Sequence, residues 1–411
     1  MEHFRRHRRV TSRPEEIQTG VGIDAGSNAT RCVICVVEDG YQRLEGYAEV
    51  ASSGWVRGRI SDPDAVSDSI QRAIGLAERS AQLLVETATV GIGGSTISSG
   101  NSRGLYEFGR PREIENRDLE YAVQLSTEVQ LEHDRLLLQA SPQDFTVDGR
   151  SGLRSPQRMV ASRLEAHTHI ITASCQEHDT LVDAVNRAHL NVEETIFEGM
   201  AAAYSSVLEV ERQRGVAIAD IGAHSTELVL YAGDALAWSS SIPVGGDHFT
   251  RDIAAKFRIQ FDDAELLKRE YGCARLGLSS DNSLIEIPCC DGRPSRETVR
   301  WDLTDVLDAR AEDLFKVIKQ EILKAGMEQD LVEGLVLCGG GALLYGMEDM
   351  AEFVLNCNCR KGPAKDMDGL PDDMNRADWA TAVGLAMYSA KLKTRPEFRR
   401  KAPGFFGLVL K

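Results

Sequence analysis

The sequence predicts an α/β protein built from two similar lobes that face each other across a cleft, with an α+β subdomain inserted into the first lobe. Three observations predict this fold. A strand–turn–strand pattern near residue 22 returns near residue 219, helices alternate with apolar strands over most of the chain, and residues 99–174 interrupt that alternation. With 411 residues, the chain is long enough for two large domains.

The two matching stretches are GIDAGSNATRCVICVVEDG (22–40) and ADIGAHSTELVLYAGD (219–234). Each contains an apolar strand, an Asp, an apolar residue, a Gly, a short polar turn that ends at Thr, and a second apolar strand. In the alignment, Asp24 pairs with Asp220, Gly26 with Gly222 and Thr30 with Thr226. Two such hairpins half a chain apart predict two related domains.

The remaining elements follow from helical periodicity and from apolar runs. Helices are predicted over 64–82, 114–131, 180–190, 191–211, 266–272 and 309–326. A strand is predicted over 87–94, and the inserted segment contains the strand-like stretches RGLYEF, DRLLLQASPQDFTVDG and SRLEAHTHIITAS. Residues 333–347 predict a buried strand that runs into a triple glycine and then a helix.

Charge and cysteine content narrow the class of protein. Residues 1–13 carry a net charge of +4 and residues 389–411 carry +6, and subtracting both from the total of −16 leaves −26 for the body. An acidic body argues against a nucleic-acid groove, whereas basic tails suit phosphate-rich surfaces such as anionic lipid. We expect a disordered N-terminal tail and, without a secretory signal or membrane span, a cytoplasmic location. The nine cysteines are expected to be reduced, with Cys32 and Cys35 buried on opposite faces of one strand.

The paired hairpins are suited to hold phosphate groups. Successive backbone N–H groups in a tight turn bind anions, and hydroxyl groups such as those of Ser27 and Ser225 add donors. Asp24 and Asp220 would repel a phosphate unless a cation lay between them, and Mg²⁺ held largely through water meets that need. The triple glycine at 339–341 lets a ligand approach bare backbone. Together these features predict a nucleotide with Mg²⁺.

These motifs resemble the actin/Hsp70/sugar-kinase superfamily, whose phosphate-1, phosphate-2 and adenosine motifs occur in the same order. Within it, the chain is similar to the FtsA family of bacterial actin-like cell-division proteins over nearly its whole length. The narrower resemblance is carried by SSGWVRGRISDPDAV (52–66), GGSTISSGNSRG (93–104), RLEAHTHIIT (163–172), IPVGGDHFTRDIA (242–254) and AELLKREYG (264–272). It implies an actin-like (ribonuclease H-like) duplicated fold with an FtsA-type α+β inserted subdomain.

The resemblance also implies a division of the chain into subdomains. They are a basic tail at 1–19, lobe 1 at 20–98 and 175–205, the inserted subdomain 1C at 99–174, lobe 2 at 206–244 and 313–388, subdomain 2B at 245–312, and a basic linker with a membrane-targeting segment at 389–411.

ATP and Mg²⁺ in the cleft are a further implication of the resemblance. Phosphate contacts are expected from Gly26, Ser27, Asn28, Gly222, Ala223, His224, Ser225 and Thr226, with Glu198 beside them. Glu265 and Lys268 match the pair that reaches the ribose and base, although their spacing also suits a plain helix-surface ion pair. The adenosine is expected to be flanked by Gly339, Gly340, Gly341 and Ala342.

The phosphate-2 turn departs from the family pattern, which is usually Asp-Ile-Gly-Gly-Gly-Thr-Thr. Ala223 and His224 replace two of its glycines, so close backbone approach and positive φ are less available there. His224 also permits a catalytic interpretation, but histidine tolerates unusual turn backbones, and no catalytic residue is assigned. His167 and His169 share one strand face without a third ligand, so we predict that they are structural.

The C-terminal segment predicts a membrane anchor. Basic residues precede Phe405, Phe406, Leu408, Val409 and Leu410, a composition typical of interfacial segments. The apolar part is short and contains glycines at 404 and 407, so stable attachment would need many copies in a polymer. The alternative is a tail that packs on its own domain.

The functional expectation is therefore an adaptor. The resemblance implies a protein that polymerises, binds the C-terminal tail of FtsZ through about 245–312, and recruits later division proteins at the inner face of the cell membrane. ATP hydrolysis is expected to be slow or absent. Two alternatives stay open: an actin-like type IV pilus assembly protein, and a sugar-kinase-like enzyme of the same superfold.

Overall fold

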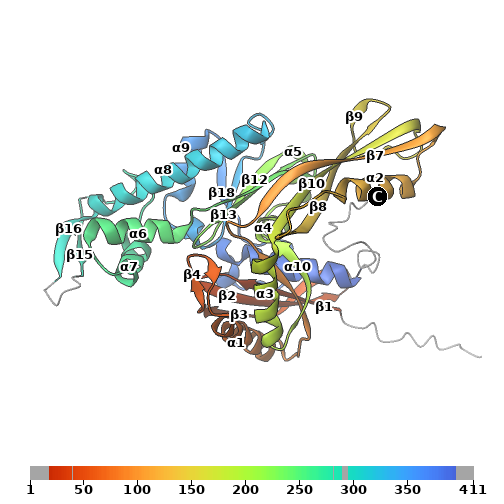
Figure 1. The fold of residues 1–411 in the computed structure, drawn as a ribbon. Helices are drawn as coiled ribbons and strands as arrows, with labels where there is room; N and C mark the ends of the chain where they lie inside the picture. The colour runs from red at the N-terminus through yellow and green to blue at the C-terminus, as the bar shows by residue number, and fades with distance from the viewer. Residues whose placement is uncertain (1–17, 39, 281, 289–294, 395–411) are drawn as a thin grey trace, which may run out of the picture.

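The chain folds into two α/β lobes with a further subdomain attached, as predicted (Figure 1). The computed structural model describes residues 18–38, 40–280, 282–288 and 295–394. The predicted basic tail and the predicted membrane-targeting residues 405–410 lie outside the described residues.

The sheet of lobe 1 has five strands in the order β11-β6-β1-β2-β3. The strands are β1 (Gln18–Ala25), β2 (Ala29–Glu38), β3 (Tyr41–Ala51), β6 (Thr87–Ile92) and β11 (Asn191–Phe197). The first three form an antiparallel meander, and β6 and β11 continue the sheet in parallel beyond β1. A short hairpin of β4 (Trp55–Val56) and β5 (Arg59–Ile60) follows the meander.

The sheet of lobe 2 repeats this topology strand for strand, in the order β18-β17-β12-β13-β14. The strands are β12 (Val216–Ile221), β13 (Thr226–Ala232), β14 (Ala235–Ile242), β17 (Leu335–Cys338) and β18 (Cys359–Lys361). Again a three-strand antiparallel meander is extended by two parallel strands. The duplication predicted from the two hairpins is confirmed.

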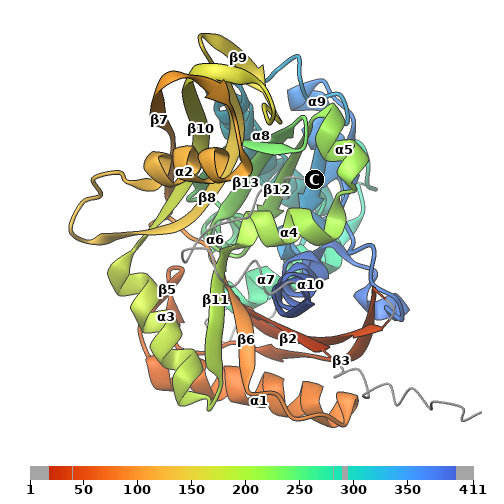
Figure 2. The same ribbon diagram turned by 90° about the vertical axis from the view of Figure 1, so that its right-hand side faces the viewer.

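Helices cover both faces of the lobe 1 sheet, and two of them lie between the lobes (Figure 2). On the outer face lie α1 (Pro63–Ala81) and α3 (Cys175–Arg187); on the inner face lie α4 (Glu198–Ser206) and α10 (Ala380–Thr394). Helix α10 packs closely on the sheet, since a Cβ on Gly22 of β1 would lie 2.4 Å from the backbone nitrogen of Ala386. Because α4 also contacts β12, β13 and β17, the two lobes share one core. Residues 380–388, which the sequence analysis places in lobe 2, therefore pack on lobe 1.

Lobe 2 carries its own helices on the face away from lobe 1. They are α6 (Gly246–Phe257), α7 (Phe261–Tyr271), α8 (Arg300–Ala325) and α9 (Met347–Leu355), with the hairpin of β15 (Leu284–Ile287) and β16 (Arg296–Val299) at one end and α5 (Glu209–Arg214) beside β13. The short 3₁₀ turn η1 (Gly340–Leu343) follows β17, while η2 (Asp372–Met374) and η3 (Ala377–Trp379) pack on the lobe 1 sheet through Met374 and Trp379. The subdomain boundary expected at residue 312 lies inside α8, which is one continuous helix.

The inserted subdomain is a four-stranded antiparallel sheet with one helix. Its elements are β7 (Ser98–Glu113), α2 (Asn116–Thr127), β8 (Arg135–Val147), β9 (Arg150–Leu153) and β10 (Val160–Ser174), in the sheet order β7-β10-β8-β9. The subdomain is inserted into the chain of lobe 1 between β6 and α3, but it packs on the edge strand β14 of lobe 2. There Ser99 Oγ donates to the Ser239 carbonyl oxygen at 2.6 Å and Gln143 Nε2 donates to the Ala237 carbonyl oxygen at 2.9 Å.

One predicted element is wrong. The helix expected over 191–211 begins only at Glu198, because residues 191–197 form β11 and pair in parallel with β6. This segment contains Val192, Thr195, Ile196 and Phe197, residue types that favour strands. The cysteine prediction agrees with the structure, since Cys32 and Cys35 are buried in different clusters on the two faces of the lobe 1 sheet. Among the described helices, none has the length and apolarity needed to span a bilayer.

Candidate functional site: the cleft between the lobes

A cavity of about 860 Å³ lies between the two lobes. It is lined by the β1–β2 turn, the β12–β13 turn, the glycines after β17 and one side of α7. Fourteen of the predicted site residues line it: Asp24, Gly26, Ser27, Asn28, Asp220, Gly222, Ala223, His224, Ser225, Glu265, Lys268, Gly339, Gly340 and Gly341. Thr226 and Ala342 do not, because both are fully buried. Thr226 Oγ1 donates to the Val244 carbonyl oxygen at 2.7 Å and so has a structural role.

The duplicated topology places two acids at equivalent points on the cleft floor. Asp24 is the next-to-last residue of β1 and Asp220 is the next-to-last residue of β12. The residue opposite the acid has a different charge in the two hairpins: Arg31 lies opposite Asp24, and Glu227 lies opposite Asp220. The same backbone frame therefore gives the two carboxylates different electrostatic surroundings.

The lobe 1 acid is partly neutralised by Arg31. One guanidinium nitrogen lies 3.7 Å from Asp24 Oδ2, and the other lies 2.6 Å from Glu49 Oε2 and 3.0 Å from Asp378 Oδ2. Burial raises the pKa of Asp24, and the charge of Arg31 opposes that rise. Three carboxylates thus share one buried cation.

Among the described residues, the lobe 2 acid forms no ion pair with a basic side chain. Asp220 Oδ2 accepts a 2.5 Å hydrogen bond from Thr381 Oγ1. Burial raises the pKa of Asp220 to about 7; the Thr381 hydrogen bond opposes the rise, and the charges of Asp24 and Glu227 add to it. Glu227 Oε1 accepts from the Gly94 amide at 2.8 Å, while Glu227 Oε2 is buried and has no hydrogen-bond partner in the described part of the chain.

A further carboxylate enters from α4. Glu198, the first residue of that helix, lines the cavity, and burial together with the charges of Asp24, Glu227 and Asp220 raises its pKa well above the ordinary value. A Cβ on Gly93 would lie 2.3 Å from Glu198 Oε2, so only glycine leaves room for this carboxylate.

The floor of the cleft therefore has more carboxyl groups than cations, and a hard cation there would favour their charged forms. Across the described residues, no three His, Cys, Asp or Glu side chains are close enough to coordinate one ion together. An ion that keeps most of its waters, as Mg²⁺ does, fits this arrangement of oxygen atoms.

The end of the cavity beside α7 has an ion pair and exposed backbone. Lys268 Nζ on α7 lies 2.7 Å from Glu265 Oε2 and donates to the Gly246 carbonyl oxygen at 3.0 Å. Gly339 has φ +80°, and a Cβ there would lie 2.4 Å from Asp220 Oδ1, whereas a Cβ on Gly340 would meet no atom. This end can accept a flat group against bare backbone with a polar pair beside it.

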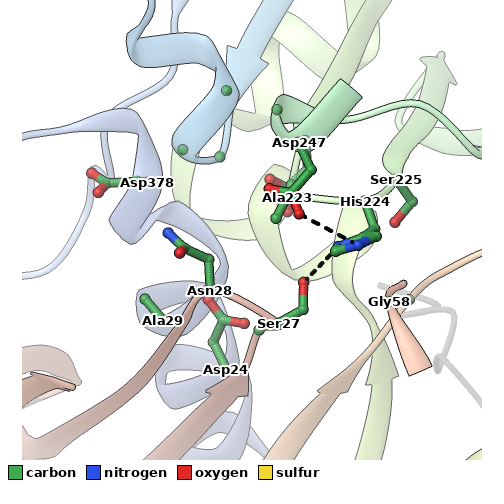
Figure 3. A pocket seen from close by; sticks show the side chains of 18 of the residues that line it. Asp24, Ser27, Asn28, Ala29, Gly58, Ala223, His224, Ser225, Asp247 and Asp378 are labelled. Carbon is green, nitrogen blue, oxygen red and sulfur yellow. Dashed lines mark hydrogen bonds and ion pairs between the residues drawn. The ribbon is translucent and has the colours of Figure 1, made fainter. Parts of the chain in front are cut away.

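His224 closes the phosphate end of the cavity. Figure 3 shows Ser27 and His224 pointing toward each other from opposite turns, with a Ser27 Oγ to His224 Nδ1 distance of 3.2 Å. Neither Ala223 nor His224 has a positive φ. The turn therefore forms without the backbone freedom of the two missing glycines, and what their replacement changes is the space between the turns.

The two candidate metal-binding histidines of the inserted subdomain have structural contacts, as predicted. His169 is fully buried, with Nδ1 2.7 Å from Asn101 Oδ1 and Nε2 2.8 Å from Ser239 Oγ of β14. Burial lowers its pKa to about 4, so the imidazole stays neutral at pH 7. His167 Nε2 lies 3.3 Å from Thr146 Oγ1.

Comparison with known proteins identifies the family. The family model "Cell division protein FtsA" matches residues 217–384, and the model "SHS2 domain inserted in FTSA" matches residues 94–172. The cell division protein FtsA of Pseudomonas aeruginosa is 32% identical over 376 residues, which are 90% of this chain and 90% of that protein. The chain belongs to the FtsA family. FtsA of Borreliella burgdorferi is 31% identical over 94% of this chain and 97% of that protein, and FtsA of Escherichia coli is 31% identical over 90% and 89%.

Solved structures support the actin-like fold of this FtsA-family chain. A PilM–PilN type IV pilus biogenesis complex matches with a TM-score of 0.66 and 18% identity, over 90% of this chain and 98% of that one. MreB5 of Spiroplasma citri bound to ADP matches with a TM-score of 0.56 and 14% identity, over 93% and 99%. At such identities the likeness concerns the fold alone.

Sequence reasoning missed several residues of the cleft. Arg31 and Glu227 follow Thr30 and Thr226 directly, so extending the hairpin register by one residue would have placed both opposite the acids. Asp378 and Thr381 come from the η3–α10 segment and meet the hairpins only through the fold, so no local pattern marks them.

Proposed function

We propose that this FtsA-family chain binds ATP and Mg²⁺, polymerises, tethers the FtsZ ring to the inner face of the cytoplasmic membrane, and recruits later division proteins. The observation that carries the nucleotide part is the pair of equivalent hairpins, which bring Asp24 and Asp220 to the floor of one cavity of about 860 Å³. The cavity volume is in the range of small-molecule and cofactor sites.

Each end of the cavity suits one end of the nucleotide. The phosphates would lie between the turns at 26–28 and 222–225, with Mg²⁺ and its waters above Asp24 and Asp220. The nucleoside would lie against Gly340, beside the Glu265–Lys268 pair. Since nothing assigns a catalytic base, the nucleotide is proposed to act as an assembly switch with slow or no hydrolysis.

The FtsZ tail is proposed to bind the subdomain at about 245–312. Large apolar side chains are exposed there on α7, on the β15–β16 hairpin and at the start of α8: Phe261, Leu266, Leu284, Val299 and Trp301. Figure 1 shows these elements together at one end of lobe 2. Exposed apolar side chains gathered in one region are typical of a surface that binds a peptide or a protein.

Self-association and membrane contact complete the proposal. Leu105, Tyr121 and Val160 are exposed on the inserted subdomain, which supports an interface with another copy or with later division proteins. The basic C-terminal segment with Phe405 and Phe406 would reach an anionic membrane. Cosedimentation with vesicles that contain anionic lipid should recover the full chain and leave a chain shortened after residue 394 in solution.

The test of partner identity is a fluorescence anisotropy titration. The full chain should bind a labelled FtsZ C-terminal peptide, and Leu284→Glu should weaken binding by about tenfold, the effect of a lost buried apolar contact. Leu84→Glu, at an exposed leucine of lobe 1, is the matched control and should change nothing. Binding of a type IV pilus peptide in place of the FtsZ peptide would contradict the proposal, as would phosphorylation of sugars by the full chain.

A further inference from the structure

The two phosphate turns of the cleft touch each other through one side-chain contact. Ser27 Oγ on the lobe 1 turn and His224 Nδ1 on the lobe 2 turn are 3.2 Å apart. Two atoms 3.2 Å apart leave no space between them for a phosphate oxygen, which needs about 2.8 Å to each donor. A phosphate that lies between these two side chains therefore has to separate them.

The imidazole of His224 is held in this position from several sides. Its Nε2 lies 3.2 Å from the Arg251 guanidinium and 3.4 Å from Asp247 Oδ2, both on α6 (Figure 3 labels Asp247). From lobe 1, the β4–β5 hairpin packs over it, since a Cβ on Gly58 would lie 2.9 Å from the His224 Cβ. The side chain is only 17% exposed. His224 is thus packed in place between the lobes.

The hydrogen-bond roles follow from the partners. Arg251 can only donate, so Nε2 accepts from it and Nδ1–H donates to the Ser27 hydroxyl in a neutral imidazole. Burial, together with the nearby charges of Arg251 and His248, lowers the pKa of His224 against the opposing charge of Asp247. The contact therefore occupies both ring nitrogens of His224 and holds the Ser27 side chain, a proposed phosphate contact, against the imidazole.

We propose that His224 is a specificity-determining residue that sets the relative affinity of the cleft for nucleoside triphosphates and diphosphates. This inference rests on the proposed function, in which the cleft binds a nucleotide with its phosphates between the turns. With the nucleoside at the Gly340 end, the terminal phosphate of a triphosphate extends furthest toward the Ser27–His224 contact and has to open it. A diphosphate ends before that point and leaves the contact intact.

The contact therefore reduces the binding free energy of the triphosphate and leaves that of the diphosphate unchanged. In a chain with a small residue at 224, the two turns would stand apart and admit the terminal phosphate without first losing a hydrogen bond. Here the contact opposes it, so the triphosphate state of this chain is harder to reach than the diphosphate state.

The test compares two nucleotides in three forms of the full chain. The dissociation constants of Mg²⁺-ADP and of a non-hydrolysable Mg²⁺-ATP analogue are measured by calorimetry for the wild type, His224→Ala and His248→Ala. Alanine is used at 224 because the position has no positive φ that would require glycine. His248 is the matched control: it lies on α6 nearby, but its Nδ1 only accepts from the Gly245 amide.

The expected result is a gain in affinity for the triphosphate analogue and not for ADP. His224→Ala should tighten the triphosphate analogue about five- to tenfold and change ADP by less than about twofold, which is the effect of removing one opposing hydrogen bond. His248→Ala should leave the ratio of the two constants unchanged. Arg251→Met, which removes one of the groups that hold the imidazole, should shift the ratio in the same direction by less.

Two results would overturn the inference while leaving the proposed function in place. One is an unchanged ratio in His224→Ala. The other is a triphosphate analogue that binds more weakly to that variant, which would make His224 a phosphate ligand. If neither nucleotide binds the wild type or any variant, the proposed nucleotide function fails, and this inference fails with it.

Discussion

The two lobes are the same fold with opposite electrostatics at the same place. Each is a five-stranded sheet whose first hairpin carries an acid to the cleft, yet Asp24 faces Arg31 across its hairpin while Asp220 faces Glu227. The lobe 1 acid is paired at 3.7 Å with a cation, whereas the lobe 2 acid accepts a hydrogen bond from the neutral Thr381 hydroxyl. Backbone duplication fixes where the carboxylates lie, and the opposing residue fixes the charge they present.

This difference indicates that the two hairpins have different roles. Arg31 holds Asp24, Glu49 and Asp378 together, and Arg376 also pairs with Asp378, so lobe 1 supplies an ion cluster in which cations offset much of the carboxylate charge. Asp220 and Glu227 have no basic partner opposite them, so lobe 2 supplies the negative charge that a cation would neutralise. The predictions below test that contrast.

The largest expected effect is on the stability of lobe 1. Arg31→Met should lower the free energy of unfolding by about 3–5 kcal/mol, because it leaves Asp24 and Glu49 without this cation and Asp378 with Arg376 alone, in a site where the Arg31 side chain is only 12% exposed. Urea denaturation at pH 7 measures this. Arg43→Met, which breaks a half-exposed ion pair with Glu45, is the control and should cost no more than about 1 kcal/mol. Equal losses in the two variants would refute the assigned role of Arg31.

The next effect concerns Mg²⁺-nucleotide affinity. Asp220→Asn should weaken binding by about 10- to 100-fold, the range for removing a charged hydrogen-bonding partner. Asp24→Asn should weaken it less, because Arg31 already offsets much of the charge of Asp24. Calorimetric titration of both variants with Mg²⁺-ADP gives the ranking. The reverse ranking would show that lobe 1 supplies the dominant cation contact.

The smallest expected effect is on the pH dependence of the free energy of unfolding. The pKa of Asp220 is about 7 in the folded chain against an ordinary value of 3.8, so between these values the folded state retains a proton that the unfolded chain has lost. The free energy of unfolding should therefore fall as pH rises from about 4 to about 7 in EDTA. Glu227→Gln removes a charge that raises the pKa of Asp220, so this fall should be shallower, as thermal melts across that pH range would show. An unchanged slope would mean that Glu227 does not affect Asp220.

Much of the fold could be predicted from local sequence. The hairpins at 22–40 and 219–234 share a pattern that places Asp, Gly and Thr at equivalent points of the two hairpins. The inserted subdomain interrupts the alternation clearly, and its strands lie close to their predicted places. The error at 191–197 arose because the apolar positions of β11 continue into those of α4 without a break in pattern.

The site could be predicted only in outline. The turns and glycines, and Glu198 through the family resemblance, could be predicted from the sequence, but the balance of charge also depends on residues that only the fold brings in, such as Asp378 and Thr381. The contact between Ser27 and His224 spans the two lobes, so no reading of either turn alone could find it.

The most direct test of the account is a calorimetric titration of the full chain with ATP, in Mg²⁺ and in EDTA. The carboxylates around Asp220 should make binding depend on the cation, with micromolar affinity in Mg²⁺ and a loss of at least about tenfold in EDTA. Binding that is absent, or that is equally tight with and without Mg²⁺, would contradict the claim that the duplicated hairpins form a cation-dependent nucleotide site.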